Sequence, residues 1–427
     1  MSRIAVIGTG YVGLTTGACF AHLGHHVVCA DVVPEKVERL ARGDVPILEA
    51  RLPELVREGI DGGRLSFVLG AANAVADCEF AYLCVSTPQA PDGSADLTYL
   101  RAAAAEIGPL LPAESVVVNK STVPVGSTRV VEEVLQRDDV AVVSNPEFLR
   151  EGSAVNDFLN PDRIVIGTED QAAAGRVATL FSSIAAPLIV TDPATAEMIK
   201  YACNAFLATK VSFVNAVANV CEAVGADVRD VVLGMGYDRR IGFEFLRPGP
   251  GWGGSCFPKD TTALLRIADD NGYDFGLLRG VQEVNEEQFD RVAAKIAAAT
   301  DGSLDGAVVA VWGLTFKART DDLRESPALQ VIARLRAGGA RVRAFDPAYT
   351  TRPEDPALTD VEVVADPYAA CEGAAVLAVL TEWDEFRRLD FGKVGDLLAA
   401  RRVVDARNLL DPAALRRAGF TYDGIGR

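Results

Sequence analysis

The chain has 427 residues, 49% hydrophobic and 24% charged, which is typical of a soluble globular protein with two or three domains. Its formal charge of −17 argues against a general nucleic-acid binder or a protein of anionic membrane surfaces. No apolar window is long enough to span a bilayer, and the N-terminus enters an apolar strand without a signal pattern.

The eight cysteines have no CxxC spacing, and no His/Cys cluster has the spacing of a zinc site. We therefore expect reduced thiols, a cytoplasmic location and no metal. The only three histidines are His22, His25 and His26. Catalysis elsewhere in the chain would therefore rely on Cys, Lys, Asp, Glu and bound water.

The chain begins with a strand at 3–7, a glycine-rich turn and a helix that continues to about Leu23. This is the GxGxxG fingerprint in the context it requires, where glycines admit a pyrophosphate and the helix N-terminus binds it. The residues expected to contact the dinucleotide here are Gly8, Gly10, Tyr11, Val12 and Gly13.

A second strand at 26–30 ends at Asp31. A carboxylate there accepts a hydrogen bond from a ribose 2′-hydroxyl and repels a 2′-phosphate, which favours NAD over NADP. FAD is the alternative cofactor, because it shares the fingerprint.

Four more apolar strands are predicted, as in a parallel sheet that is buried on both faces, at 80–85, 116–120, 140–144 and 164–167. Polar turns follow the first three and should line the ligand site. Thr87 and Thr122 either cap helices or contact ligand. Glu147 and Glu151 either share a solvated helix face or belong to the site.

One long helix is predicted from Thr195 to about Gly225, roughly 45 Å at 1.5 Å per residue. It has no charge between Lys210 and Glu222, so we expect burial on several sides and a subunit interface. Lys200 and Asn204 lie four residues apart on one face and could polarise a hydroxyl or carbonyl oxygen. The alternative is a surface lysine and a core asparagine.

A Gly-rich loop follows from 249 to 260 and surrounds a single thiol, Cys256, so a ligand or another backbone could come close to it. Pro258 marks the start of a helix, so the thiol lies at a helix N-terminus beside Lys259, which should lower its pKa. Asp260 is close enough in sequence to join the same site. Arg239, Arg240 and Arg247 precede the loop and suit an anionic ligand, or else form ordinary salt bridges.

The C-terminal third repeats the α/β pattern without GxGxxG. A helix is predicted from Asn271 to about Ala299, and Ser326 and Pro327 begin another. Strands are predicted at 307–311, 341–345, 375–380 and 402–404. Lys317 and Arg407 follow strand ends, where they could meet phosphate or hydroxyl groups.

The predicted fold is therefore α/β, with two doubly wound Rossmann-like domains joined by a long central helix. We expect a Rossmann domain for NAD at 1–192, a central helical domain with the Cys loop at 193–300, and a nucleotide-sugar domain at 301–427.

Six motifs make the chain resemble the UDP-glucose/GDP-mannose dehydrogenase family over essentially its whole length. They are the Gly8 turn, Lys-Ser-Thr-Val-Pro-Val-Gly from Lys120, Asn-Pro-Glu-Phe-Leu-Arg-Glu-Gly from Asn145, Lys200 with Asn204, Gly-Gly-Ser-Cys-Phe-Pro-Lys-Asp from Gly253, and Gly-Leu-Thr-Phe-Lys from Gly313. The Cys-Phe-Pro-Lys-Asp form is closer to the UDP-glucose enzymes of the family than to those for GDP-mannose or UDP-N-acetylmannosamine.

The resemblance implies that two NAD⁺ oxidise the C6 alcohol of UDP-glucose to a carboxylate, without a metal. On this reading Lys200, Asn204 and a water held by Thr122 and Asp260 serve the first oxidation. Cys256 then adds to the aldehyde, a thioester follows, and water assisted by Glu147 or Asp260 hydrolyses it.

The resemblance also implies a homodimer through the central helix and further contact residues. Cofactor contacts would include Lys36, Thr87, Glu151, Lys259 and Arg324. Substrate contacts would include Phe148, Leu149, Phe245, Leu246, Arg247, Gly253, Lys317 and Arg407, with Arg240 reaching across the subunit interface. Arg247 departs from relatives that carry Lys there, but it retains the positive charge.

Two other functions remain open. A two-electron dehydrogenase of the 6-phosphogluconate or 3-hydroxyacid type also places Lys and Asn four apart on a central helix, but it leaves Cys256 without a role. A non-catalytic NAD-binding sensor would have no use for Lys200, Asn204, Cys256 and Asp260 together.

Overall fold

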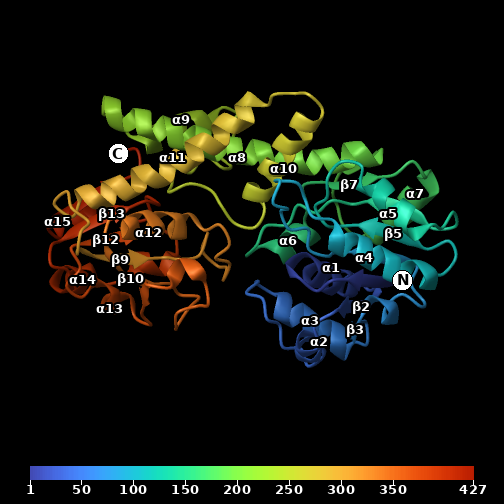
Figure 1. Ribbon diagram of the computed structural model, residues 1–427. Helices are drawn as coiled ribbons and strands as arrows, with labels where there is room; N and C mark the ends of the chain where they lie inside the picture. The colour runs from blue at the N-terminus through green and yellow to red at the C-terminus, as the bar shows by residue number, and fades with distance from the viewer. The chain divides into compact units, whose positions relative to one another are not determined.

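The computed structural model describes residues 1–427, which pack as two compact units (Figure 1). The N-terminal unit comprises residues 1–203 and 262–272, and the C-terminal unit comprises residues 204–261 and 273–427. Each unit is built around its own β-sheet.

The sheet of the N-terminal unit has eight strands in the order β3-β2-β1-β4-β5-β6-β7-β8. Neighbouring strands run parallel except β6 and β7, which meet antiparallel at Ser144 and Gly167. The strands are β1 Arg3–Ile7, β2 His26–Asp31, β3 Leu65–Leu69, β4 Phe80–Leu83, β5 Val116–Asn119, β6 Ala141–Ser144, β7 Ile164–Gly167 and β8 Leu188–Thr191.

Successive residues of β1 point to opposite faces of this sheet, so each strand serves two cores. Ile4 and Val6 belong to one core, together with α1, α3, α6 and α7, and Ala5 and Ile7 belong to the other, with α4 and α5. The helices are α1 Tyr11–His22, α2 Pro34–Ala41, α3 Leu52–Asp61, α4 Thr98–Ile107, α5 Ser127–Leu135, α6 Ala154–Leu159 and α7 Gln171–Leu180.

The strand order of the N-terminal unit reverses between β1 and β4, and ligands of such sheets bind outside the strand ends at this point. The glycine turn follows β1 and the turn containing Thr87 follows β4. The topology therefore places the predicted dinucleotide residues where the fold provides a binding crevice.

The sheet of the C-terminal unit has six parallel strands in the order β11-β10-β9-β12-β13-β14, with its reversal between β9 and β12. The strands are β9 Val308–Trp312, β10 Arg341–Phe345, β11 Glu362–Val363, β12 Val376–Val379, β13 Arg402–Asp405 and β14 Thr421–Gly424. Val309 and Val311 face a core shared with α11 and α12, whereas Ala310 and Trp312 face the core of α13, α14 and α15.

Two helices contribute residues to both units: α8, Pro193–Val224, and α10, Phe257–Asp270. The remaining helices of the C-terminal unit are α9 Val228–Tyr237, α11 Gly276–Ala298, α12 Pro327–Ala337, α13 Pro367–Cys371, α14 Phe391–Leu397 and α15 Pro412–Arg417. Helix α12 begins as predicted, with the Ser326 side chain accepting a hydrogen bond from the amide of Ala328 and Pro327 at its first position.

The predicted α/β fold with two doubly wound sheets and a long helix is confirmed. The helix predicted from Asn271 was wrong at its start, because α10 ends at Asp270 and Gly272 adopts a φ of +73° in the turn before α11. Strands β3, β8, β11 and β14 were not predicted. No helix of the structure is long and apolar enough to cross a membrane.

Candidate functional site

The three glycines of the turn after β1 serve different purposes. Gly8 has a φ of +96°, and a Cβ there would lie 2.7 Å from the carbonyl oxygen of Cys84. A Cβ on Gly13 would collide with the carbonyl oxygen of Gly8. At Gly10, by contrast, a Cβ would meet nothing within 4 Å, so the backbone at the start of α1 is open to an approaching group. That is the arrangement a pyrophosphate requires.

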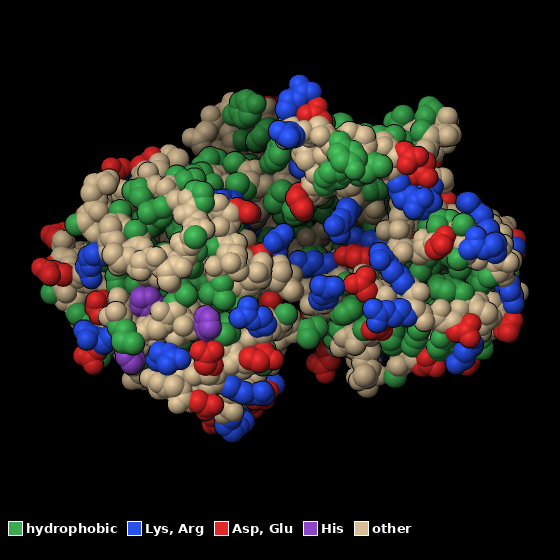
Figure 2. Space-filling model, turned by 180° about the vertical axis from the view of Figure 1, so that it is seen from behind, with side chains coloured by type: hydrophobic (Ala, Val, Ile, Leu, Met, Phe, Trp, Pro, Cys, Tyr) green, Lys and Arg blue, Asp and Glu red, His purple; other side chains and the backbone are tan.

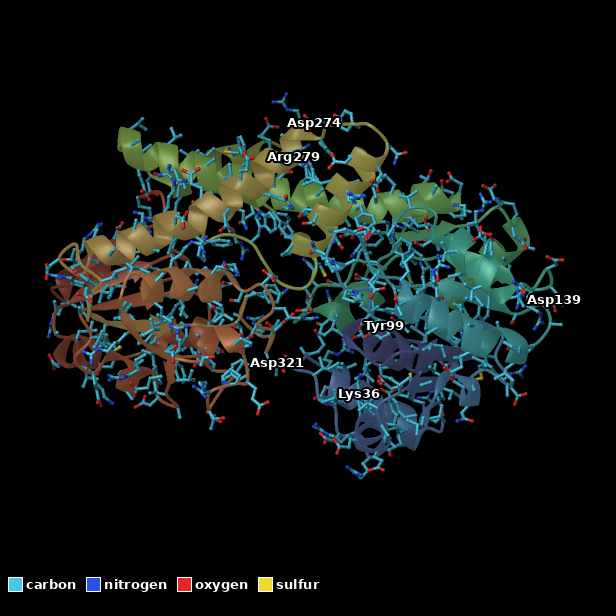
Figure 3. The ribbon with its side chains drawn as sticks, viewed as in Figure 1. Lys36, Tyr99, Asp139, Asp274, Arg279 and Asp321 are labelled. Atoms are coloured by element: carbon cyan, nitrogen blue, oxygen red, sulfur yellow. The ribbon has the colours of Figure 1, made fainter.

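Asp31 is held as an ionised acceptor at the end of β2. Its Oδ2 accepts hydrogen bonds from the Thr9 amide at 3.0 Å and the Thr9 hydroxyl at 2.5 Å, and it pairs with Lys36 Nζ at 2.8 Å. Burial favours the neutral acid, but the hydrogen bonds from Lys36 and Thr9 outweigh it and lower the pKa of Asp31 to about 2. Lys36 extends from α2 (Figure 3). The pair is suited to a ribose diol rather than to a further negative charge.

The turns after β4 and β5 are joined by hydrogen bonds between side chain and backbone. The Thr87 hydroxyl donates to the carbonyl oxygen of Thr122 at 2.8 Å, and the Ser121 hydroxyl donates to that of Val85 at 2.6 Å. The structure thus brings Thr87 and Thr122 together next to the reversal of strand order, and neither caps a helix.

A buried ion pair joins the loop after β6 to α8. Lys200 Nζ lies 2.7 Å from Glu147 Oε1, and both side chains are 5% exposed. Burial favours the neutral acid, but the attraction of Lys200, its hydrogen bond and the Leu149 amide together lower the pKa of Glu147. The Glu147–Leu149 segment is irregular rather than helical, so the predicted alternative of a shared helix face for Glu147 and Glu151 was wrong. The centroid of the Phe148 ring lies 3.5 Å from the Arg163 guanidinium and 5.5 Å from Lys200 Nζ.

A second buried carboxylate connects this loop to the glycine turn. Tyr11 donates its hydroxyl hydrogen to Glu49, and the Gly152 amide donates to the Tyr11 hydroxyl at 2.7 Å and to Glu49 Oε2 at 2.8 Å. Glu49 is 4% exposed. These contacts fix the segment that carries Glu147 and Glu151 against the start of α1.

The C-terminal unit brings Asn204, Cys256, Lys259 and Asp260 together. Asn204 Nδ2 donates to Asp260 Oδ2 at 2.6 Å, and Lys259 Nζ lies 2.6 Å from Asp260 Oδ1. Cys256 directly precedes α10, and its carbonyl oxygen accepts a hydrogen bond from the Asp260 amide at 2.8 Å. Lys200 and Asn204 are one helical turn apart on α8. The thiol and the carboxylate therefore lie at the start of α10, and the carboxylate is hydrogen-bonded to an amide within α8.

The Gly-rich loop before Cys256 is fixed by side chains of α8 and α11. Asn215 accepts from the Gly249 amide at 2.8 Å, and Gln288 donates to the Gly249 carbonyl oxygen at 2.8 Å. Asn285 makes a matching pair of hydrogen bonds with the backbone of Trp252. The loop is thus rigid at its backbone, a requirement for placing a nucleophile.

The glycines of this loop are required for internal packing as well as for any ligand. A Cβ on Gly253 would collide with the carbonyl oxygen of Glu325, and one on Gly254 would lie 2.8 Å from the Phe316 ring. Phe245 has a φ of +64°, Leu246 is buried, and Arg247 is exposed. The close approach predicted for this loop is made at Gly253 by another backbone segment.

Lys317 and Arg407 follow the strands β9 and β13. The Arg407 guanidinium donates to the carbonyl oxygens of Leu380 at 2.8 Å and Phe316 at 3.1 Å, and it pairs with Glu382 at 3.0 Å. Lys317 lies 5.1 Å from the Phe316 ring. The two cations therefore flank the same residue at the reversal of strand order in this sheet.

Arg240 and Arg324 lie on the surface. The Arg240 side chain is 87% exposed and pairs with Asp238 at 2.6 Å. The Arg324 side chain is 65% exposed and pairs with Asp322 at 2.7 Å. Within its own unit each arginine is held by an aspartate two residues earlier in the chain.

One buried lysine near Glu147 was not predicted from the sequence as a site residue. Lys120 is 5% exposed and donates to Asn145 Oδ1 at 3.1 Å, and burial lowers its pKa to about 8 although Glu147 partly offsets this. It lines a cavity of about 240 Å³ with Asn145, Phe148 and Arg163. A lysine at the end of an apolar strand is the one signal that could have identified it. No cluster of three or more His, Cys, Asp or Glu that could hold a metal ion occurs in the structure.

Comparison with known proteins covers all three parts of the chain. Residues 2–185 match the model of the NAD binding domain of the UDP-glucose/GDP-mannose dehydrogenase family, residues 194–287 match its central domain, and residues 310–412 match its UDP binding domain.

Full-length relatives have matching sequences and folds. The UDP-glucose 6-dehydrogenase TuaD of Bacillus subtilis is 46% identical over 100% of this chain and 94% of its own, and the UDP-glucose 6-dehydrogenase of Pseudomonas aeruginosa is 44% identical over 100% and 97%. The solved UDP-glucose dehydrogenase of Pyrobaculum islandicum superimposes with a TM-score of 0.90 at 39% identity, covering 100% of this chain and 98% of that one.

The cysteines provide a test of which thiol is reactive. Six are buried, whereas Cys203 and Cys256 are partly exposed, and burial raises the pKa of Cys19, Cys78, Cys84 and Cys371 to about 12. Native protein treated with iodoacetamide should carry the label on Cys256 and Cys203 alone, as read by peptide mass spectrometry. Labelling of the buried thiols before denaturation would contradict this assignment.

Asp31→Asn should weaken NAD⁺ binding without unfolding the protein. Hydrogen bonds to a charged group contribute about 1.5–3 kcal/mol, so Kd should rise about tenfold or more. Calorimetric titration with NAD⁺ measures this directly. Asp44→Asn, on the exposed pair with Arg39, is the control, and it should leave Kd unchanged.

Proposed function

The chain belongs to the UDP-glucose/GDP-mannose dehydrogenase family, and from this premise we propose that it oxidises UDP-glucose to UDP-glucuronate with two NAD⁺. The relatives at 44–46% identity are named as UDP-glucose 6-dehydrogenases, which supports this sugar nucleotide over GDP-mannose and UDP-N-acetylmannosamine. The observation that carries the proposal is the hydrogen bond from Asn204 to Asp260, one turn beyond Cys256.

NAD fits the N-terminal unit, because the space at Gly10 admits a phosphate and the ionised Asp31 provides an acceptor for a ribose. Gly8, Gly10, Tyr11, Val12, Gly13, Asp31 and Lys36 would hold it, with Thr87, Thr122, Glu151, Lys259 and Arg324. When bound, the nicotinamide accepts one hydride from C6 in each oxidation.

The first task of the protein groups is to take the proton of the C6 hydroxyl, through a water that Thr122 and Asp260 would hold, and to stabilise the alkoxide that forms. The Lys200 ammonium and the Asn204 amide supply donors from one face of α8. Lys200 pairs with Glu147, whose pKa is lowered, so this ion pair is in place before the substrate arrives. A preformed cation at this point lowers the barrier without reorganisation of solvent.

Cys256 then acts as the nucleophile. Its sulfur adds to the aldehyde carbon, Lys200 and Asn204 stabilise the oxyanion, and the resulting thiohemiacetal is oxidised to a thioester. Water cleaves the thioester, releasing the carboxylate and regenerating the thiol, with Glu147 or Asp260 accepting the proton. The fixed backbone of the loop supports this role, because a nucleophile must be positioned to within a fraction of an ångström.

The nucleotide sugar would be held by backbone and cationic groups. Phe148 and Leu149 would contact the sugar, and Phe245, Leu246, Arg247 and Gly253 would line its path. Lys317 and Arg407 would meet the phosphates, which is chemically apt because guanidinium and ammonium groups bind phosphate with charge-assisted hydrogen bonds. We assign residues 1–192 to NAD, 193–300 to the spine and Cys loop, and 301–427 to the UDP-sugar.

We also propose a cytoplasmic homodimer formed through α8. Phe206, Phe213 and Val220 recur every seven residues on this helix and are 64%, 55% and 60% exposed. A repeat of seven residues forms one stripe along a helix, and three large apolar side chains on it are the pattern of a helix–helix interface. Arg240 would reach the partner's substrate from such a dimer. All eight thiols are free, as in a reducing compartment.

Counting NADH tests the reaction. Each UDP-glucose consumed should yield two NADH, measured by absorbance, and UDP-N-acetylmannosamine and GDP-mannose should give rates lower by at least tenfold. Cys256→Ser should complete only the first oxidation and yield at most one NADH, because serine is a far weaker nucleophile.

Cys203→Ser, which alters the other partly exposed thiol, is the control and should retain two NADH per sugar. One NADH from the unaltered protein would indicate a two-electron dehydrogenase, and none would indicate a sensor.

Phe213→Asp combined with Val220→Asp should convert the dimer to a monomer, because two buried carboxylates cannot be accommodated in an apolar interface. Light scattering after gel filtration gives the mass. Tyr99→Asp is the matched control, since Tyr99 is an aromatic side chain of α4 that is 56% exposed (Figure 3). A monomeric unaltered protein would overturn the proposed interface.

A further inference from the structure

A cavity of about 640 Å³ in the C-terminal unit is lined by four arginines that have no part in the proposed chemistry. Arg229 begins α9, Arg387 lies before α14, Arg416 lies in α15, and Arg427 follows β14. The chain carries a net charge of −17, and carboxylates lie among the lysines and arginines on the face that Figure 2 draws. Four guanidinium groups around one cavity are therefore a local exception.

These arginines are poorly satisfied by the carboxylates near them. Arg229 lies 3.8 Å from Asp227, Arg427 lies 3.6 Å from the same residue, and Arg387 lies 3.8 Å from Asp384. All three separations exceed hydrogen-bond length, whereas Arg240 and Asp238 approach to 2.6 Å.

The remaining groups around the cavity do not supply the missing acceptors. Asp384 is already bound by Arg319 at 3.1 Å, and Asp411 accepts hydrogen bonds from the Ala413 and Ala414 amides at the start of α15. Arg416 is in no ion pair and lies 5.9 Å from the Tyr422 ring.

Arg427 gives the clearest indication that an acceptor is missing. Its side chain is 11% exposed, and its Nη1 is buried without any hydrogen-bond partner. A buried guanidinium nitrogen without an acceptor is unfavourable, and an anion that enters the cavity would remove this penalty.

The cavity also has an apolar wall. Leu409, Leu410 and Leu415 are buried behind it at 8%, 5% and 3% exposure, and Phe391 adds an aromatic ring. A site with several cations and an apolar wall matches a molecule that carries a phosphate on an apolar or aromatic body. The volume is in the range of pockets for small molecules, about 300–1,000 Å³.

Hydrogen bonds already hold the segments around the cavity in place without a ligand. Asn408 exchanges hydrogen bonds with the backbone of Ile425 at 2.8 and 3.1 Å. The buried Asp405 accepts from the Leu410 amide at 2.7 Å and from the Tyr422 hydroxyl at 3.1 Å. A ligand would therefore not have to order the loop after β13 or the segment at Ile425, which favours binding.

We propose that this cavity is a second ligand site, for a small phosphorylated molecule. The phosphate binds between Arg229, Arg416 and Arg427, and the organic part lies against Leu409 and Leu410. None of these residues belongs to the proposed NAD, sugar or catalytic groups, so the site goes beyond the proposed function and does not depend on it.

Calorimetric titration with inorganic pyrophosphate tests the site, with sodium chloride at equal ionic strength in the reference titration. Because pyrophosphate can also occupy nucleotide sites, the decisive measure is the change caused by Arg229→Gln with Arg416→Gln. This variant should lose one binding event or weaken it at least tenfold. Arg129→Gln with Arg291→Gln removes the same charge from exposed positions on α5 and α11 and should titrate like the unaltered protein.

Two further measurements locate the site and test its apolar wall. Crystals soaked in tungstate should show anomalous density among Arg229, Arg416 and Arg427. Phenyl phosphate should bind there at least tenfold more tightly than inorganic phosphate. The site would be overturned by unchanged titration of the double variant, by an empty cavity after the soak, or by equal affinity for the two phosphates. NADH production by the double variant should be unchanged, which separates this test from the proposed reaction.

Discussion

The ion pair between Glu147 and Lys200 is the contact on which the arrangement of the N-terminal unit depends. Two charges are removed from water together, which is tolerable only because each satisfies the other and the Leu149 amide occupies the second carboxylate oxygen. The pair fixes an irregular loop against a long helix. Since the same loop is tied to the start of α1 through Gly152, Tyr11 and Glu49, the dinucleotide turn and the lysine share one rigid frame.

Local signals in the sequence predicted the parts of the site whose geometry is set within a few residues. The Gly8–Gly13 turn, Asp31 at a strand end, the Lys200–Asn204 spacing and Cys256 at a helix start depend on backbone rules that operate over one or two turns. Pairings across the fold could not be predicted in this way. Glu49 with Tyr11, Asn215 with Gly249 and the antiparallel meeting of β6 and β7 join segments that lie far apart in the chain.

The two sheets share one architecture, but the turns that follow their strands differ and carry different chemical groups. Gly8 and Gly313 directly follow β1 and β9, and a Cβ on either would collide with a residue that follows the neighbouring strand, Cys84 or Thr381. The turn after β1 continues through the open Gly10 straight into α1, whereas the turn after β9 carries Lys317 and reaches its helix only at Pro327. From sequence, the Gly-rich loop could admit either a ligand or another backbone; only the fold reveals that Gly253 and Gly254 serve close packing against Glu325 and Phe316.

The bond from Lys36 to Asp31 bears on how coenzyme preference could evolve. Replacing the aspartate with a neutral residue would remove the repulsion of a 2′-phosphate and, in the same step, release an ammonium group placed to bind that phosphate. One substitution would thus remove a repulsion and add an attraction, and both changes would favour NADP over NAD. A protein of this fold that evolved to use NADP would have needed few mutations, because the lysine that binds the 2′-phosphate was already present.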